Sequence, residues 1–267
     1  MPRNPARNAP ADPDFMLSLA RGLAVMRALA SEGARLSIGD VARITNVSRA
    51  SAGRCLHTLE TLGYATASQG TYELTPMVLS LASNYLAAAP NQFGVGAIAQ
   101  IAQPVLERVS KQLNESASLA VLDDADIIYL ARAAARRILS VELAVGSRLP
   151  AACTSMGRVL LAHLNGDLRS RYLNKMKLHA YTPHTIVNKA QLRAELDKVR
   201  AQGYAIVDQE LEIGLRSIAV PVRRKDNVVV AAVNAGVHVA RADSRALCRE
   251  FLPVLQRAAD NITASIG

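Results

Sequence analysis

The sequence predicts an α+β protein with two domains, a small helical domain that ends in a hairpin and a larger domain of mixed helices and strands. Three observations predict this class. Capped segments of helical periodicity fill residues 18–63, an alternating pattern surrounds Gln69-Gly70, and from residue 95 onward strands are joined both by hairpins and by helices. With 267 residues, of which 50% are hydrophobic, the chain can bury two separate cores.

Composition excludes several classes of protein. The sequence has no run of about 18 apolar residues that could cross a membrane, and residues 1–15 contain Pro and Asp where a secretory signal would be apolar. We therefore expect a cytoplasmic protein with no membrane partner. The three cysteines are widely spaced and odd in number, and the five histidines are scattered. We expect no disulfide framework, no metal and no other cofactor.

The first predicted segments are a tail and a helix. Residues 1–15, rich in Pro, Asn and Ala, are expected to be a disordered tail. A helix follows from Ser18 to about Gly33, because apolar residues recur between them at helical spacing. The residues expected to face the core are Leu19, Leu23, Met26 and Ala30.

Two more helices and a hairpin come next. Ser37 can cap the second helix, which ends at Asn46, a residue that tolerates the left-handed conformation of a sharp corner. Ser48 can cap the third helix, which Gly63 closes. The inner residues expected are Ile38, Val41, Ala42 and Ile44, then Ala52, Cys55, Leu56, Leu59 and Leu62. Three helices and a hairpin in this order are typical of a winged helix-turn-helix, which we assign to residues 16–75.

The third helix is predicted to enter the major groove of double-stranded DNA. A helix fits that groove, and arginine binds guanine or phosphate there. The net charge of +9 indicates an anionic partner, and residues 21–64 hold six arginines against three acidic residues. The predicted DNA contacts are Arg49, Ala50, Ser51, Gly53, Arg54, His57, Gln69 and Thr71. The alternative is a solvated helix of a small bundle with an ordinary polar turn; the capped corner and the hairpin favour DNA.

A linker helix is predicted over residues 76–92, because Thr75 can cap it and Pro76 is tolerated at its first position. Its apolar face is expected to pack on a second copy of the chain. Residues 93–267 then form the α+β domain. Its expected elements are a helix at 95–113, strands at 118–124, 126–133 and 138–145, a helix at 156–164, two further helices, strands at 216–222 and 228–236, and a last helix at 244–266.

A helix start in this domain is a candidate anion site. Thr154 or Ser155 can cap the helix that follows Pro150, so free N–H groups point out of its first turn. Such a start attracts a carboxylate or phosphate, although ordinary capping would give the same pattern. The candidates for a counter-charge are Arg148, Arg158 and Arg216, whereas Arg132, Arg136 and Arg137 are interpreted as a solvated edge or a subunit contact.

Three stretches resemble one protein family. They are the winged helix at 19–74, "LPAACTSMGRVLLA" at 149–162, and "GYAIVDQELEIGLRSIAVPV" at 203–222. Together they resemble the IclR family of bacterial transcriptional regulators over nearly the whole chain from Ser18. The stretch at 146–162 further resembles the subgroup that controls aromatic-acid catabolism, whose effectors include protocatechuate, 4-hydroxybenzoate and β-ketoadipate.

The resemblance implies a GAF-like effector-binding domain and an assembly of homodimers or tetramers on operator DNA. It also implies an effector site. The main-chain N–H groups of Ser155 and Met156 would meet the effector's carboxylate. Val141, Leu149 and Leu215 would form apolar walls, and Asp208, Ser217 and Asn234 would supply polar contacts.

The function predicted is therefore a DNA-binding transcriptional regulator that senses a small carboxylate and controls a catabolic operon. One alternative is a hydrolase-like enzyme with an appended helical module. Asp208, Glu210 and Glu212 are close in sequence, yet no G-x-S-x-G, Gly-rich phosphate loop or His-Glu-x-x-His is present, so no catalytic residue is predicted. A general chromosome-binding protein is a second alternative.

Overall fold

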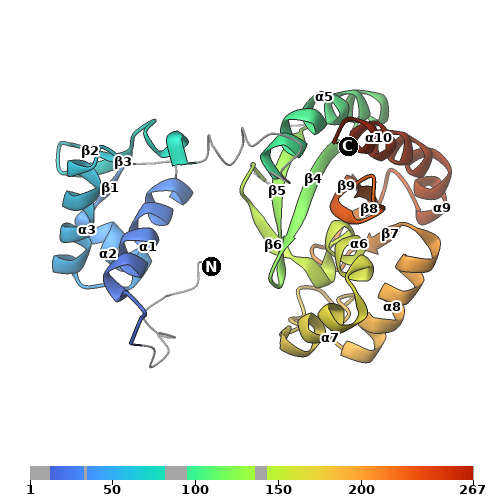
Figure 1. Ribbon diagram of the computed structural model, residues 1–267, viewed down its shortest axis with the longest axis horizontal. Coiled ribbons are helices and arrows are strands. Elements are labelled where there is room, and N and C mark those ends of the chain that lie inside the picture. Colours follow the sequence, from blue (N-terminus) through green and yellow to red (C-terminus); the bar gives the residue numbers. More distant parts are fainter. Residues whose placement is uncertain (1–12, 33–34, 82–94, 136–142, 267) are drawn as a thin grey trace. The chain divides into compact units, whose positions relative to one another are not determined.

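Two compact units make up the chain, Met1–Asn84 and Tyr85–Gly267. The structure is a computed structural model, and it describes residues 13–32, 35–81, 95–135 and 143–266 (Figure 1). The predicted tail at 1–15 lies almost entirely outside the described residues, and so does most of the predicted linker helix, of which residues 78–81 are seen as helix.

Within residues 17–74 of the N-terminal unit, the described residues form three helices and a three-stranded antiparallel sheet. Its elements are α1 (Leu17–Glu32), β1 (Leu36–Ser37), α2 (Ile38–Thr45), α3 (Arg49–Thr61), β2 (Ala65–Ser68) and β3 (Thr71–Leu74). The sheet order is β1-β3-β2. The sequence did not indicate β1, because two residues are too few to show an alternating pattern. At the hairpin tip Gln69 and Gly70 both have positive φ, 50° and 77°, as a two-residue type I′ turn requires.

The corner between α2 and α3 forms as predicted. Ser37 caps α2, and its hydroxyl and the Asp40 carboxylate exchange hydrogen bonds with each other's backbone N–H groups in a capping box. Asn46 ends α2 with φ 53° and ψ 43°, in the left-handed region. Ser48 then caps α3 by accepting from the Ser51 N–H. These short-range hydrogen bonds set the angle at which α3 leaves α2.

The predicted inner stripe of α1 was wrong at three of its four residues, whereas Met26 is partly buried and packs against the core. Leu19 is 58% exposed and Leu23 is 44% exposed, and Ala30 is exposed as well, whereas the buried residues are Val25, Ala28 and Leu29. Apolar residues surround α1 on most sides, so spacing alone could not select the buried face. Contacts with α2 and α3 select it. Leu62, also expected inside, is 58% exposed because α3 ends at Thr61.

The C-terminal unit is built on a six-stranded antiparallel sheet of order β6-β5-β4-β9-β8-β7. Its strands are β4 (Ser116–Asp123), β5 (Asp126–Ala133), β6 (Arg148–Pro150), β7 (Ala205–Asp208), β8 (Leu215–Arg223) and β9 (Val229–His238). Four predicted strands are confirmed. The fifth, at 138–145, falls mostly outside the described residues, and residues 143–145 are not strand. The short strands β6 and β7 were not predicted.

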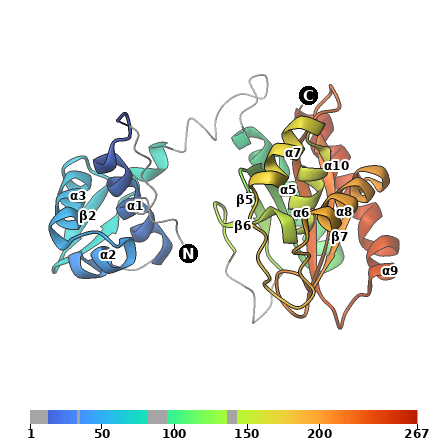
Figure 2. The same cartoon turned by 90° about the horizontal axis from the view of Figure 1, so that it is seen from below.

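Helices cover both faces of this sheet. α5 (Val95–Leu113) and the C-terminal helix α10 (Leu252–Ile266) pack on one face, where they bury a core of residues such as Leu106, Leu119 and Ile218 (Figure 1). The opposite layer contains α6 (Ser155–His163), α7 (Gly166–Lys175) and α8 (Lys189–Gln202), and Figure 2 looks onto it. Of these, α6 lies directly on the strands and buries a second core.

The C-terminal helix is continuous from α9 (Ser244–Ala246) through a π-helical turn (Leu247–Phe251) into α10. The predicted helix at 244–266 is therefore confirmed, with a local change of hydrogen-bond pattern. Pro253 has no N–H to donate to the carbonyl four residues earlier, and at Leu252 the N–H reaches back five residues to Leu247.

His163 at the end of α6 should make folding pH-dependent. Its Nδ1 lies 2.8 Å from the Val159 carbonyl and its Nε2 lies 3.0 Å from Nη2 of Arg223. Burial lowers the pKa of His163, and the charges of Arg223 and Arg200 lower it further. The unfolded chain, with an ordinary histidine pKa of about 6.5, then binds the proton first. The stability that neutral His163 contributes is present above that pH and is lost as the pH falls below it.

We expect the free energy of unfolding to fall less between pH 7 and pH 5 in His163→Gln than in the unmodified chain. Urea unfolding at several pH values measures this difference. Equal slopes in the two proteins would show that His163 does not carry the linkage.

Candidate functional sites: a basic helix and a cavity

The outer face of α3 is basic and open. Ala52, Leu56 and Leu59 are buried against the N-terminal core, and this fixes which side of the helix faces out. On the outer side Arg49, Ala50, Arg54 and His57 are exposed, while Ser51 and Gly53 are half-buried. The predicted face is therefore the one that the structure presents.

Arg49 and Arg54, the two arginines of this face, make no ion pair with a carboxylate among the described residues. Two other arginines of the same unit are paired, Arg35 with Glu73 at 2.9 Å and Arg43 with Asp40 at 3.2 Å. A free guanidinium on an exposed helix is available to a phosphate or a base edge.

The remaining predicted DNA contacts differ in how available they are. A Cβ at Gly53 would lie 3.9 Å from Ile38, which is ordinary contact, so the packing of the helices does not require glycine there. Gln69 is exposed at the hairpin tip. Thr71 is half-buried, and its hydroxyl already donates to the Ser68 carbonyl at 2.8 Å. That hydroxyl is less available to DNA than the Gln69 amide.

The C-terminal unit contains a cavity of about 440 Å³ on the α6 side of the sheet. Its position follows from the alternation of side chains along a strand. Ala120, Ala219 and Ala232 pack in the core beneath α6. The cavity is lined by Ser118, Ser217 and Asn234. Each of them lies two residues from one of these alanines on the same strand, and therefore on the same face of the sheet.

The first turn of α6 forms one wall of the cavity. Thr154 caps the helix by accepting from the Gly157 N–H at 3.3 Å. The N–H groups of Ser155 and Met156 have no acceptor among the described residues. A Cβ at Gly157 would lie 2.2 Å from the Ala151 carbonyl oxygen, so only glycine lets the turn Ala151–Cys153 approach α6 this closely.

Unpartnered polar atoms face this space. Ser155 is 1% exposed and its Oγ has no hydrogen-bond partner, and the buried Oδ1 of Asn234 also has none. Buried polar atoms without partners are rare in native proteins and mark places where a ligand or water binds. Both residues line the cavity.

The lining contains one arginine, Arg132, whose Nη1 lies 3.3 Å from the Ser118 hydroxyl. Two carboxylates also line the cavity, Glu212 and Glu115, and Glu115 is paired with Arg241 at 2.7 Å. The interpretation of Arg132 as a solvated edge was wrong, because its part of β5 faces the cavity. The three arginines expected as counter-charges lie elsewhere. Arg158 pairs with Glu210 at 2.6 Å, Arg148 with Asp123 at 2.5 Å, and Arg216 with Asp208 at 2.7 Å.

Five of the predicted effector residues line the cavity, namely Leu149, Ser155, Leu215, Ser217 and Asn234. Asp208 does not, which corrects the prediction. Its neighbour Val207 lines the cavity, and successive residues of a strand alternate, so Asp208 points away and meets its register partner Arg216. The Met156 side chain is fully buried in the core, and Val141 lies outside the described residues.

Sequence reasoning missed several wall residues, among them Ser116, Ser118, Tyr129, Arg132, Leu143 and His238. They come from three distant parts of the chain and share no motif. Burial raises the pKa of Tyr129 to about 12 and that of Cys153, also in the wall, to about 12. Both groups therefore stay protonated at neutral pH.

At the cavity, Ser155 has no neighbour among the described residues that would activate it as a nucleophile. Ser155 Oγ makes no hydrogen bond to a histidine or carboxylate, and the nearby carboxylates of Asp208 and Glu210 are in ion pairs. No group of three or more His, Cys, Asp or Glu side chains is placed to bind a cation in this part of the chain. None of the described helices is long and apolar enough to cross a membrane.

Two family profiles match the chain. Residues 18–68 match the IclR helix-turn-helix domain, and residues 94–264 match the bacterial transcriptional regulator IclR C-terminal domain. The chain belongs to the IclR family. The predicted family and the predicted fold class, a winged helix-turn-helix followed by an α+β domain, are both confirmed.

Several IclR-family relatives are similar over most of their length. The Pca regulon regulatory protein of Pseudomonas putida is 47% identical over 252 residues, covering 94% of this chain and 84% of that protein. The p-hydroxybenzoate hydroxylase transcriptional activator of Acinetobacter baylyi is 32% identical over 254 residues, covering 93% and 91%. These IclR-family relatives are transcriptional regulators, and none of these comparisons supports the hydrolase alternative.

Solved structures agree with this assignment. A crystal structure from Rhodococcus sp. RHA1 is 42% identical, has a TM-score of 0.80, and covers 95% of this chain and 100% of that one. An IclR homolog from Microbacterium hydrocarbonoxydans, complexed with 4-hydroxybenzoate, is 26% identical with a TM-score of 0.79, covering 93% and 98%.

Proposed function

We propose that this IclR-family regulator binds operator DNA through α3 and the β2–β3 hairpin, and that a small aromatic carboxylate in the cavity controls this binding. The observation that carries the proposal is that one cavity is lined by a free helix start, the unpartnered Ser155 hydroxyl and the guanidinium of Arg132. These groups suit a carboxylate.

The carboxylate needs such partners because an anion loses its hydration when it enters a protein. The N–H groups of Ser155 and Met156 and the dipole of α6 favour negative charge at the helix start. Arg132 offers a charge-assisted hydrogen bond, which is about twice as strong as a neutral one.

The remaining walls suit a flat apolar ring. Tyr129, Leu143, Leu149 and Leu215 contribute apolar surface, and a cavity of about 440 Å³ lies within the usual range for small-molecule sites. Relatives support the same chemistry, since one is named for p-hydroxybenzoate hydroxylase and one homolog was solved with 4-hydroxybenzoate. We propose an aromatic effector of the protocatechuate or 4-hydroxybenzoate type, with β-ketoadipate, an acid without a ring, as the remaining candidate of the predicted set.

The effector would act by shifting the populations of the arrangements that the two recognition helices of a dimer can adopt. Helix-turn-helix proteins commonly bind paired half-sites as dimers, and we propose a homodimer or a tetramer built from two dimers. An effector that binds one arrangement of the two recognition helices more tightly shifts the protein towards that arrangement, by no more than its differential affinity.

A gel-shift series tests the function. Purified protein is titrated into DNA from beside its own gene and into a scrambled duplex of equal length, at one salt concentration, with and without each candidate acid. A regulator should prefer its own site by about a thousandfold or more. Equal affinity for both duplexes would instead identify a general chromosome-binding protein, and hydrolysis of aryl esters without any shift would identify an enzyme.

Removing the cavity's guanidinium should weaken effector binding. In Arg132→Gln we expect a loss of about 1.5 to 3 kcal/mol, because a hydrogen bond to a charged group is replaced by a neutral one. Isothermal titration with 4-hydroxybenzoate and protocatechuate measures this loss. Arg148→Gln, which alters an exposed arginine outside the wall, is the control, and equal affinities in the two variants would remove Arg132 from the site.

A further inference from the structure

A buried ion pair lies just outside the cavity. Arg158, on the second turn of α6, is 2% exposed, and Glu210, which follows β7, is 6% exposed. Their side chains meet with Nη2 of Arg158 2.6 Å from Oε2 of Glu210. Neither residue lines the cavity.

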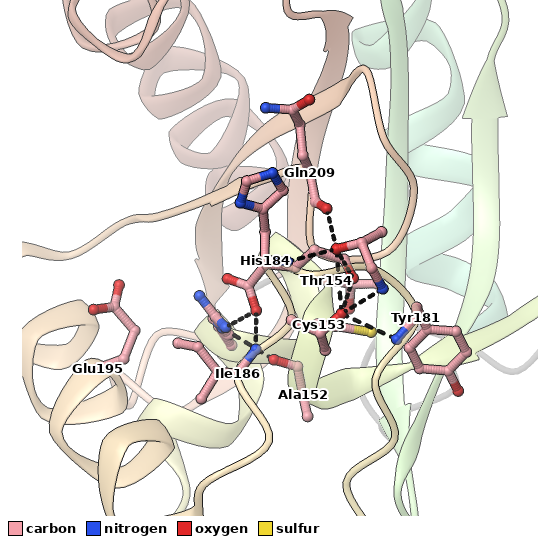
Figure 3. Close-up of polar contacts among 12 residues, drawn as sticks. Ala152, Cys153, Thr154, Tyr181, His184, Ile186, Glu195 and Gln209 are labelled. Carbon is pink, nitrogen blue, oxygen red and sulfur yellow. Dashed lines mark hydrogen bonds and ion pairs between the residues drawn. The ribbon is translucent and has the colours of Figure 1, made fainter.

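The pair is anchored at both ends by the backbone. Nε of Arg158 donates to the Ala152 carbonyl at 3.0 Å, and Oε2 of Glu210 also accepts from the Ile186 N–H at 3.0 Å. Figure 3 shows Ala152 and Ile186 close to each other among the dashed contacts. The side chains therefore connect three separate segments, the turn 151–153, the loop 179–188 and the segment that begins at Gln209.

Two threonine hydroxyls reinforce the connection between the loop 179–188 and the segment that begins at Gln209. Thr182 donates to the Gln209 carbonyl at 2.6 Å, and Thr185 donates to the Glu210 carbonyl at 2.6 Å (Figure 3). The backbone of residues 209–210 is thus fixed to the loop at two consecutive carbonyls as well as through the Glu210 side chain.

Both anchored segments continue directly into the cavity wall. Cys153, Thr154 and Ser155 follow Ala152, and residues 211–214 follow Glu210. The wall that would bind the carboxylate and the wall contributed by residues 211–214 are therefore joined to each other through Arg158 and Glu210.

Stability alone does not account for such a pair. Removing two charges from water is costly, and exchanging a buried ion pair for apolar side chains of similar volume is often neutral or even stabilising. A fully hydrogen-bonded pair does, however, define a single arrangement of the segments that it joins. A wall that is held in place before the ligand arrives loses less entropy on binding.

We propose that Arg158 and Glu210 are positioning residues for the effector, which hold the start of α6 and segment 209–214 at the spacing that the bound acid requires. This inference rests on the proposed function of the cavity. The two residues act through Ser155 and residues 211–214 and do not touch the effector.

The test is a double replacement, Arg158→Met with Glu210→Met, which removes both charges and leaves neither one buried alone. We expect the affinity for 4-hydroxybenzoate or protocatechuate to fall at least about tenfold as preorganisation is lost. Amide hydrogen exchange in segment 209–214 of the free protein should become faster. Binding to operator DNA without the acid should be unchanged.

Matched variants separate positioning from general stability. Arg169→Gln with Asp197→Asn removes another ion pair of the same unit, 2.8 Å long and outside the cavity wall, and should leave affinity unchanged. Arg158→Lys keeps the charge and should retain most of the affinity. Thr185→Val removes one anchor of residues 209–210, together with the hydrogen bonds that the Thr185 hydroxyl accepts from the Tyr181 and Thr182 N–H groups. It leaves the ion pair in place, so it supplies a milder test should the double variant not fold, and it should raise the Kd severalfold.

The outcomes distinguish a failure of the positioning role from a failure of the proposed function of the cavity. If the unmodified protein binds none of 4-hydroxybenzoate, protocatechuate and β-ketoadipate, the proposed effector class is wrong and the inference fails with it. If the unmodified protein binds, while the double variant or Thr185→Val binds equally well and residues 209–214 exchange at the same rate, only the positioning role is refuted.

Discussion

Replacing Ser155 by Pro is expected to abolish effector binding and to leave the fold and operator binding intact. Ser155 is the first residue of α6, where proline is well tolerated, and the preceding Thr154 already has the extended backbone that proline requires, with φ −122° and ψ 144°. The substitution removes one N–H donor and the Ser155 hydroxyl together, and its ring fills the space that the N–H faced. We expect affinity to fall by about a hundredfold or more, since two donors to an anion are lost.

Titration calorimetry with 4-hydroxybenzoate and protocatechuate measures this loss, and the melting temperature without ligand checks the fold. Ser155→Ala, which removes the hydroxyl alone, should show an intermediate loss. The neighbouring Met156 is a poorer choice for proline because its side chain is fully buried in the core. Retained affinity in a folded Ser155→Pro protein would exclude the helix start as the carboxylate site.

Removing both unpaired arginines of α3 should nearly eliminate specific DNA binding. If Arg49 and Arg54 each make a bidentate base contact, Arg49→Ala with Arg54→Ala should weaken operator binding by about 2 to 6 kcal/mol, at about 1 to 3 kcal/mol for each. The salt dependence separates two roles, because a lost phosphate contact lowers the slope of log K against log salt by about one for each arginine.

Fluorescence anisotropy with operator and scrambled duplexes, at several salt concentrations, makes this measurement. Arg193→Ala, an exposed arginine on α8, carries the same charge change outside the winged helix and should have little effect. An unchanged isotherm for the double variant would remove α3 from the interface and would require another surface to bind the anion.

Elements with local signals could be predicted closely. The helix predicted at 95–113 has those bounds, and the predicted hairpin turns at residues 69–70 and 224–227 are both present. Segments with weak local signals were missed. Strands β1, β6 and β7 contain two to four residues, and they form only because a longer strand lies beside them.

The site was predicted in part, and the errors share a cause. Residues next to the α6 start, such as Ser155, were found because a cap and a Pro-containing loop mark a helix terminus. The errors concern strand residues and long charged side chains. Arg132 was taken for an edge residue and Asp208 for a cavity residue, whereas the structure places Arg132 in the wall and turns Asp208 away.

The sequence by itself determined the capped corner of the winged helix and the start of α6, because hydrogen bonds within about four residues create them and both partners can be identified from their spacing. Only the tertiary structure decided which arginine faces the cavity and which is neutralised by a carboxylate. A one-residue change of strand register reverses the face of every side chain, and the partner of Arg158 lies 52 residues away. Long-range pairing, which no local pattern encodes, therefore assigns the charges to their places.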